Sequence, residues 1–167
     1  MLKKIAVLLF LVIIVFVSGC TDTTVDPVNN TDQVKSEQIP TINLPTGFTY
    51  MATLETNITR GNFSKKAIEG VYRTDTGEDI YIDVFKSESP EAVMEEYKAT
   101  YKDEGYEPFT EIYFNGHKAT KVTTQFISDG RPANKYRIIW TTKDSMINVG
   151  SSTDAQKAIN LATATNS

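Results

Sequence analysis

The pair Asn115–Gly116 restricts the possible folds of this chain most, because it stands between two strand-like runs at 110–114 and 118–127. Asparagine followed by glycine readily adopts the positive φ angles that a two-residue hairpin turn requires. Turn-forming residues at 75–77 and 142–144 predict two further hairpins in the same way, and residues 129–132, Asp-Gly-Arg-Pro, predict another turn. A chain that folds back on itself so often is expected to build a sheet of antiparallel neighbours.

Two segments between the strand-like runs have helical signals. The first, residues 90–104, follows Ser89 and has a proline in its first turn. The second begins after Thr153, whose partner Gln156 completes a capping box. Residues 57–64 are polar and are predicted to form a loop. The order of strands, helix, strands and helix predicts the α+β class, with two helices packed on an antiparallel sheet of about six or seven strands.

The first twenty residues have the layout of an export signal. Two lysines precede an uncharged apolar run at 5–17, and small residues then lead to Cys20. The apolar run is shorter than the roughly 20 residues that span a membrane comfortably. Residues 17–20, Val-Ser-Gly-Cys, resemble the lipobox of prokaryotic lipoproteins, with valine where leucine is usual. The resemblance implies cleavage before Cys20 and attachment of lipid to its sulfur.

An uncleaved anchor helix, or a plain signal peptide with a chance cysteine, is the alternative to a lipoprotein signal. Cys20 is the only cysteine, so the chain forms no internal disulfide. Residues 21–40 are polar and without periodicity, which predicts a disordered tether. We therefore expect a signal peptide at 1–19, a lipidated tether at 20–41 and one α+β domain at 42–167. The protein is expected on the extracytoplasmic face of the cell membrane, anchored by its lipid.

Charge excludes some partners. Without Lys3 and Lys4, the 17 basic residues become 15, against 21 acidic residues. A net negative chain lacks the basic surface that nucleic acid requires. It also lacks the polybasic patch of proteins that adhere to anionic lipid. The expected contact with the membrane is therefore the N-terminal lipid alone.

Several short strings resemble a known group of proteins. They lie at residues 70–73 (Gly-Val-Tyr-Arg), 81–85 (Tyr-Ile-Asp-Val-Phe), 89–93 (Ser-Pro-Glu-Ala-Val), 136–140 (Tyr-Arg-Ile-Ile-Trp) and 147–150 (Ile-Asn-Val-Gly). In this order they are similar to prokaryotic lipoprotein domains related to the PsbP fold, which is named for an extrinsic subunit of photosystem II. The resemblance implies a PsbP-like fold and, because similar small lipoproteins are frequent in methanogenic archaea, an archaeal source. It carries no catalytic motif.

Metal-binding candidates are few. His117 is the only histidine, and zinc requires three or four nitrogen or sulfur ligands. Residues 75–79, Asp-Thr-Gly-Glu-Asp, are rich in oxygen like part of a calcium loop, but the EF-hand spacing is missing and turn formation explains them. We predict no metal site and no cofactor.

Two clusters are candidates for catalysis or binding. Glu95, Glu96, Asp103 and Glu104 include possible paired carboxylates, although a solvated helix face explains them as well. Aromatic side chains could form a surface for sugars or peptides, although aromatic residues are also common in strands. The members of this possible patch are Tyr81, Phe85 and Tyr136.

Three Asn-x-Ser/Thr sequons begin at Asn29, Asn57 and Asn62. On an exported chain they could carry glycans, and chance occurrence is the alternative. With no serine-hydrolase elbow, phosphate loop or dinucleotide fingerprint, we expect a non-enzymatic surface domain. It would be a binding module or envelope accessory with an unknown protein or glycan ligand. The alternative is an extracytoplasmic hydrolase with an unrecognised carboxylate or serine site.

Overall fold

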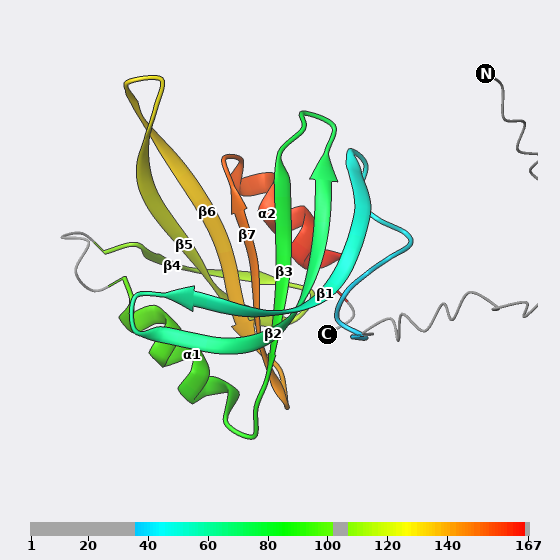
Figure 1. Cartoon of the computed structure of the whole chain (residues 1–167), viewed down its shortest axis with the longest axis vertical. Coiled ribbons are helices and arrows are strands. Elements are labelled where there is room, and N and C mark those ends of the chain that lie inside the picture. The colour runs from blue at the N-terminus through cyan, green and yellow to red at the C-terminus, as the bar shows by residue number, and fades with distance from the viewer. Residues whose placement is uncertain (1–35, 102–106, 166–167) are drawn as a thin grey trace, which may run out of the picture. The chain divides into compact units, whose positions relative to one another are not determined.

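The computed structural model describes residues 36–101 and 107–165 (Figure 1). The expected signal peptide, Cys20, most of the tether and the sequon at Asn29 lie outside the described residues, as do Asp103 and Glu104. Within the described part of the chain, no helix is long and apolar enough to cross a membrane.

The described residues form one seven-stranded sheet and two helices, which confirms the predicted α+β class. Every pair of neighbouring strands is antiparallel, in the order β1-β2-β3-β7-β6-β5-β4. The strands are β1 (Phe48–Arg60), β2 (Phe63–Thr74), β3 (Asp79–Lys86), β4 (Phe109–Phe114), β5 (His117–Ser128), β6 (Arg131–Thr141) and β7 (Ser145–Ser152). The helices are α1 (Pro90–Ala99) and α2 (Ala155–Thr163).

The sheet consists of two meanders that meet at its centre. Strands β1 to β3 follow one another by hairpins, and α1 then carries the chain towards β4 at the opposite edge (Figure 1). Strands β4 to β7 return to the middle, where β7 pairs with β3. The two central strands therefore come from distant parts of the sequence.

The two helices cover opposite faces of the sheet, so the domain has two cores. On one face, called the α2 face here, Ala158 and Leu161 pack against the aliphatic side of β3 and against Trp140. On the other, called the α1 face, Val93 and Tyr97 pack against Phe85 and other apolar side chains. Because successive strand residues point to opposite faces, β3 is buried on both sides.

The predicted hairpin turns are confirmed. Asn115 and Gly116 have φ angles of 46° and 80°, and Asp129 and Gly130 have φ angles of 51° and 74°. Two consecutive positive φ angles define the type I′ turn, whose twist matches that of the flanking strands. Local backbone chemistry is sufficient to place these turns.

The prediction of a loop at residues 57–64 is wrong. Strand β1 continues to Arg60 and β2 begins at Phe63, so that only Gly61 and Asn62 form the turn. Residues 57–60 belong to β1, which is an edge strand of the sheet. Polar side chains are tolerated there because an edge strand is accessible to water. Phe63 is the apolar anchor of this hairpin, because it is buried beside Phe85 and Tyr97.

The predicted helix boundaries need correction. Helix α1 ends at Ala99 instead of residue 104, and the Thr100 hydroxyl donates to the Tyr97 carbonyl at 2.7 Å in its last turn. The N-cap of α2 is Asp154 instead of Thr153, and its carboxylate accepts the backbone N–H groups of Gln156 and Lys157. A carboxylate is favoured over a hydroxyl at this position because it also interacts with the positive end of the helix dipole.

The packed domain begins before Ile42. Ile39 belongs to the core of the α2 face and is only 6% exposed. It fills the space beside Gly70, where a β-carbon would lie 2.7 Å from its side chain. The Tyr72 hydroxyl donates to the Pro40 carbonyl at 2.9 Å. Residues 36–40, expected in the tether, are thus held against the sheet, whereas Ile42 itself is 74% exposed.

Candidate functional site

A cleft of about 260 Å³ opens on the α1 face, between the end of β1 and strands β3, β6 and β7. The β1–β2 hairpin covers the cleft like a roof, and it extends across this face towards α1 (Figure 1). Arg60 secures the hairpin there, because its Nε donates to the Thr100 hydroxyl at 3.1 Å. The Arg60 guanidinium also lies 3.8 Å from the centre of the Tyr101 ring.

The sheet register collects the polar side chains of the cleft into two adjacent rows. In the first row, Glu69 of β2, Asp83 of β3 and Asn148 of β7 are direct cross-strand partners. The second row begins with Tyr81, two residues before Asp83 on β3. Tyr81 is paired with Gly150 of β7, and Gly150 is paired with Arg137 of β6. Residues two apart on a strand point to the same face, so both rows face the cleft.

Asp83 and Asn148 form the buried floor of the cleft. Their side chains are 4% and 3% exposed, and the Asn148 amide donates to Asp83 Oδ2 at 2.7 Å. Asp83 Oδ1 and Asn148 Oδ1 accept no hydrogen bond from any residue that the structure describes. Such buried acceptors are rare in folded proteins and each costs about 1–3 kcal/mol. The floor therefore holds two oxygen atoms that a ligand could satisfy.

The charge state of Asp83 is set mainly by its burial. Loss of hydration raises the pKa of Asp83 to about 7, and Glu69 acts in the same direction through its negative charge and through a hydrogen bond that favours the protonated Asp83 carboxyl. The hydrogen bond from Asn148 and the positive charge of Arg137 act in the opposite direction, but they do not outweigh burial. A large part of Asp83 is thus protonated at neutral pH.

Arg137 contributes a positive charge to the cleft. Its stem lies across Gly150, where a β-carbon would come within 2.5 Å of Arg137 Cγ. Gly150 also has a φ angle of 156°, which side chains rarely permit. Within residues 36–101 and 107–165, no hydrogen bond or ion pair holds the Arg137 guanidinium, whereas that of Arg60 is bound to α1.

The end of the cleft nearest α1 is less polar. Ile58 of β1 and Tyr97 of α1 line it. The Tyr97 hydroxyl accepts from the Tyr101 hydroxyl at 3.1 Å, so the polar atom of this ring is already engaged. The cleft therefore combines a charged, hydrogen-bonding wall with an apolar end, as small-molecule sites commonly do.

The sequence-predicted candidates lie elsewhere, with one exception. Tyr81 lines the cleft, but Phe85 is 1% exposed in the core beneath α1, so the possible aromatic surface patch with Tyr136 does not form. The physical reason is that α1 covers this end of β3. His117 begins β5 and lies beside the Phe114 and Trp140 rings, away from the cleft.

The carboxylates of α1 do not converge on a common point. Glu95 pairs with Lys98 at 3.0 Å, and Glu96 pairs with Lys65 of β2 at 2.9 Å. Both glutamates are exposed, as the alternative of a solvated helix face predicted. Exposed pairs of this kind contribute little to stability.

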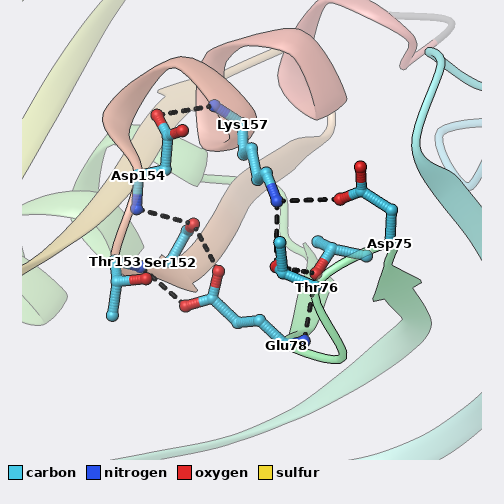
Figure 2. Close-up of polar contacts among 8 residues, drawn as sticks. Asp75, Thr76, Glu78, Ser152, Thr153, Asp154 and Lys157 are labelled. Atoms are coloured by element: carbon cyan, nitrogen blue, oxygen red, sulfur yellow. Dashed lines mark hydrogen bonds and ion pairs between the residues drawn. The ribbon is translucent and has the colours of Figure 1, made fainter.

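The oxygen-rich turn at residues 75–79 joins the β2–β3 hairpin to the start of α2 (Figure 2). Asp75 pairs with Lys157 at 3.0 Å. The Glu78 carboxylate accepts the Ser152 hydroxyl at 2.9 Å and the Thr153 N–H at 2.7 Å. The carboxylates of the turn thus have separate protein partners. Among the described residues, no group of His, Cys, Asp and Glu side chains is arranged to hold a metal ion.

The two described sequons differ in their local structure. Asn57 lies within β1 and Asn62 lies in the β1–β2 turn, and both side chains are exposed. The expectation of a loop holds for Asn62 only. Both asparagines are on the hairpin that roofs the cleft.

Apart from Tyr81, sequence reasoning missed the residues that line the cleft. Asp83 carries the one signal that could have indicated it, since it is the only charged residue in the otherwise apolar run 80–85. Asn148 interrupts the apolar run 146–149 in a similar way. Neither residue identifies its partners, which depend on the strand order.

Comparison of the chain with models of known protein families, with curated proteins and with solved structures gives no significant match.

Proposed function

We propose that this chain is an exported, lipid-anchored protein of the extracytoplasmic membrane face, and that its domain is a binding module for a small polar ligand. The signal-like N-terminus and Cys20 support the location. We also propose that the domain has a PsbP-like fold, which the order of strands and helices supports. The exposed Asn57 and Asn62 are proposed glycan acceptors.

One observation carries the binding function. The floor of the cleft contains two buried oxygen atoms, on Asp83 and Asn148, that accept no hydrogen bond from the described residues. An unsatisfied buried acceptor destabilises the domain, and a ligand that donates hydrogen bonds to it would offset that cost. If this face of the sheet had only a structural role, buried acceptors without donors beside an open cleft would destabilise it with no compensating benefit.

Blocking the cleft tests this proposal. The full-length chain would be dialysed against small molecules extracted from the cells that produce it, and enriched molecules would be identified by mass spectrometry. Ile58, half-buried at the apolar end of the cleft, becomes a plug in Ile58→Trp. Thr49→Trp, exposed elsewhere on β1, is the control. We expect enrichment by the wild type and the control, and its loss in Ile58→Trp, with thermal unfolding used to verify that both variants are folded. Equal enrichment by all three, or none, would refute a ligand site here.

A hydrolase is the second candidate, favoured by the Glu69–Asp83 pair. Two carboxyl groups directly opposite one another, one of them protonated near neutral pH, can act as acid and base in hydrolysis. A hydrolase would convert the enriched molecule during dialysis, and Glu69→Gln should abolish conversion while binding remains measurable. Recovery of the molecule unchanged assigns the cleft to binding alone.

A further inference from the structure

The cleft brings together opposite charges that do not neutralise each other directly. Arg137 and the carboxyls of Asp83 and Glu69 lie on adjacent rows of the same sheet face. Arg137 affects Asp83 electrostatically, yet no hydrogen bond or ion pair joins them in the described chain. Rows two residues apart are separated by about 7 Å along a strand, which leaves space for a small molecule between the two charged groups.

We propose that the cleft binds a small zwitterion such as a free α-amino acid, with its carboxylate on Arg137 and its ammonium group against Asp83, Asn148 and Glu69. This proposal rests on the proposed binding function and names the ligand class of the same site. The cleft volume of about 260 Å³ is just below the roughly 300–1,000 Å³ of sites for drug-sized ligands, which favours a smaller molecule.

The hydrogen-bonding capacity of the cleft fits the two ends of such a ligand. An ammonium group has three donors and no acceptor. Asp83 Oδ1 and Asn148 Oδ1 accept no hydrogen bond within the described chain, and the Glu69 carboxylate lies opposite Asp83 on the neighbouring strand. At the other end, the planar guanidinium of Arg137 can hold a carboxylate through two parallel hydrogen bonds.

A neutral polyol fits less well than a zwitterion. It would satisfy the acceptors on the floor, but it would cover Arg137 and Glu69 without supplying opposite charges. Covering a charge without a counter-charge is costly. The apolar end of the cleft, formed by Ile58 and Tyr97, is suited to an aliphatic side chain. Among amino acids, those with aliphatic side chains are therefore expected to bind best.

Titration calorimetry on the full-length chain in detergent tests the ligand class. The common L-amino acids would be examined one by one, and L-leucine would be compared with N-acetyl-L-leucine, L-leucinamide and glucose. Each modified leucine lacks one of the two charges. Loss of a charged hydrogen-bonding group is expected to weaken binding about tenfold to a hundredfold. Because these comparisons use the unaltered protein, they do not depend on the folding of a variant.

Arg137→Gln provides the complementary test, with Arg131→Gln as a matched control on the exposed start of the same strand. We expect a tenfold or greater loss of leucine affinity in the first variant and none in the second, with thermal unfolding used to verify that both are folded. Proton release is a further readout, because an ammonium group beside Asp83 favours its ionised form. Near pH 7, the measured heat should therefore depend on the buffer.

The outcomes separate the two proposals. Binding of glucose without any amino acid would overturn the zwitterion and leave the cleft as a ligand site. If no amino acid binds, or if both modified leucines bind as well as leucine, the zwitterion is also overturned. If Ile58→Trp loses nothing in the dialysis experiment, the binding function itself fails.

Discussion

At the scale of single residues, Asp83 has the greatest conflict between burial and charge. It lies on the central strand β3, where the adjacent residues Ile82 and Val84 are core side chains. Groups that face it come from four other positions: Glu69 of β2, Asn148 of β7, Arg137 of β6 and Tyr97 of α1. None of them fully compensates the lost hydration, so the proton is retained to higher pH than in an unfolded chain.

Asp83→Asn should stabilise the domain at about pH 8 and give no advantage at about pH 3. A carboxyl whose pKa is raised on folding, here from 3.8 to about 7, contributes stability below 3.8 and loses it as pH rises through 7. The asparagine carries no charge and avoids that loss. The gain is at most about 4 kcal/mol, since each pKa unit corresponds to about 1.4 kcal/mol.

Equilibrium denaturation at several pH values measures this difference. Asp129→Asn, in an exposed turn, is the control and should change stability little at any pH. A stability difference between Asp83→Asn and the wild type that does not vary between pH 3 and pH 8 would show that folding does not raise the pKa of Asp83.

The cleft could not be predicted from the sequence for a geometric reason. Asp83 meets Glu69 through a hairpin that was predicted, but it meets Asn148 through the pairing of β3 with β7. No local signal determines which strands of separate meanders become neighbours. Arg137 is paired with Gly150 through the predicted β6–β7 hairpin, but only the pairing of β3 with β7 brings both residues beside Tyr81 and Asp83. The isolated Asp83 in an apolar strand was the one sequence signal of a site. Its partners can be identified only once the strand order is known.

At the scale of elements, turn chemistry was a better guide than composition. Asn115–Gly116 and Asp129–Gly130 were placed correctly because positive φ angles favour these residue types. Residues 57–64 were misassigned because polar composition was taken to indicate a loop, although an edge strand is also polar. The α2 cap was misplaced by one residue, since Thr153 and Asp154 are both good N-caps and only the observed contacts distinguish them.

The segment that precedes β1 offers a paired test of the domain boundary. Ile39→Ala should reduce the free energy of unfolding by about 2 kcal/mol, the lower end for truncation of a buried isoleucine, because Ile39 packs beside Gly70. Ile42→Ala changes the same residue type at an exposed position and should have almost no effect. Urea denaturation of both variants measures the difference. Equal effects would return the boundary to Ile42.

At the scale of the whole molecule, the attachment of the chain to a membrane depends on Cys20. Replacing Cys20 with serine removes the thiolate that would accept the lipid. The wild-type N-terminal peptide should begin at Cys20 and carry the added lipid mass. The serine variant should lack that mass and retain residues 1–19 if processing requires prior lipidation. Mass spectrometry of the peptide decides the question, and an unmodified wild-type Cys20 contradicts the lipoprotein proposal.

The pairing of β3 with β7 also determines when the domain can fold. Residues 81–86 pair with residues 145–150, so the middle of the sheet cannot form until both segments are available. Until then β3 exposes unpaired backbone groups along one edge and apolar side chains on both faces, a combination that promotes aggregation. Contacts between such distant residues make folding slow. A chain that lacks β7 and α2 is therefore expected to aggregate. It should not fold as a smaller version of the domain.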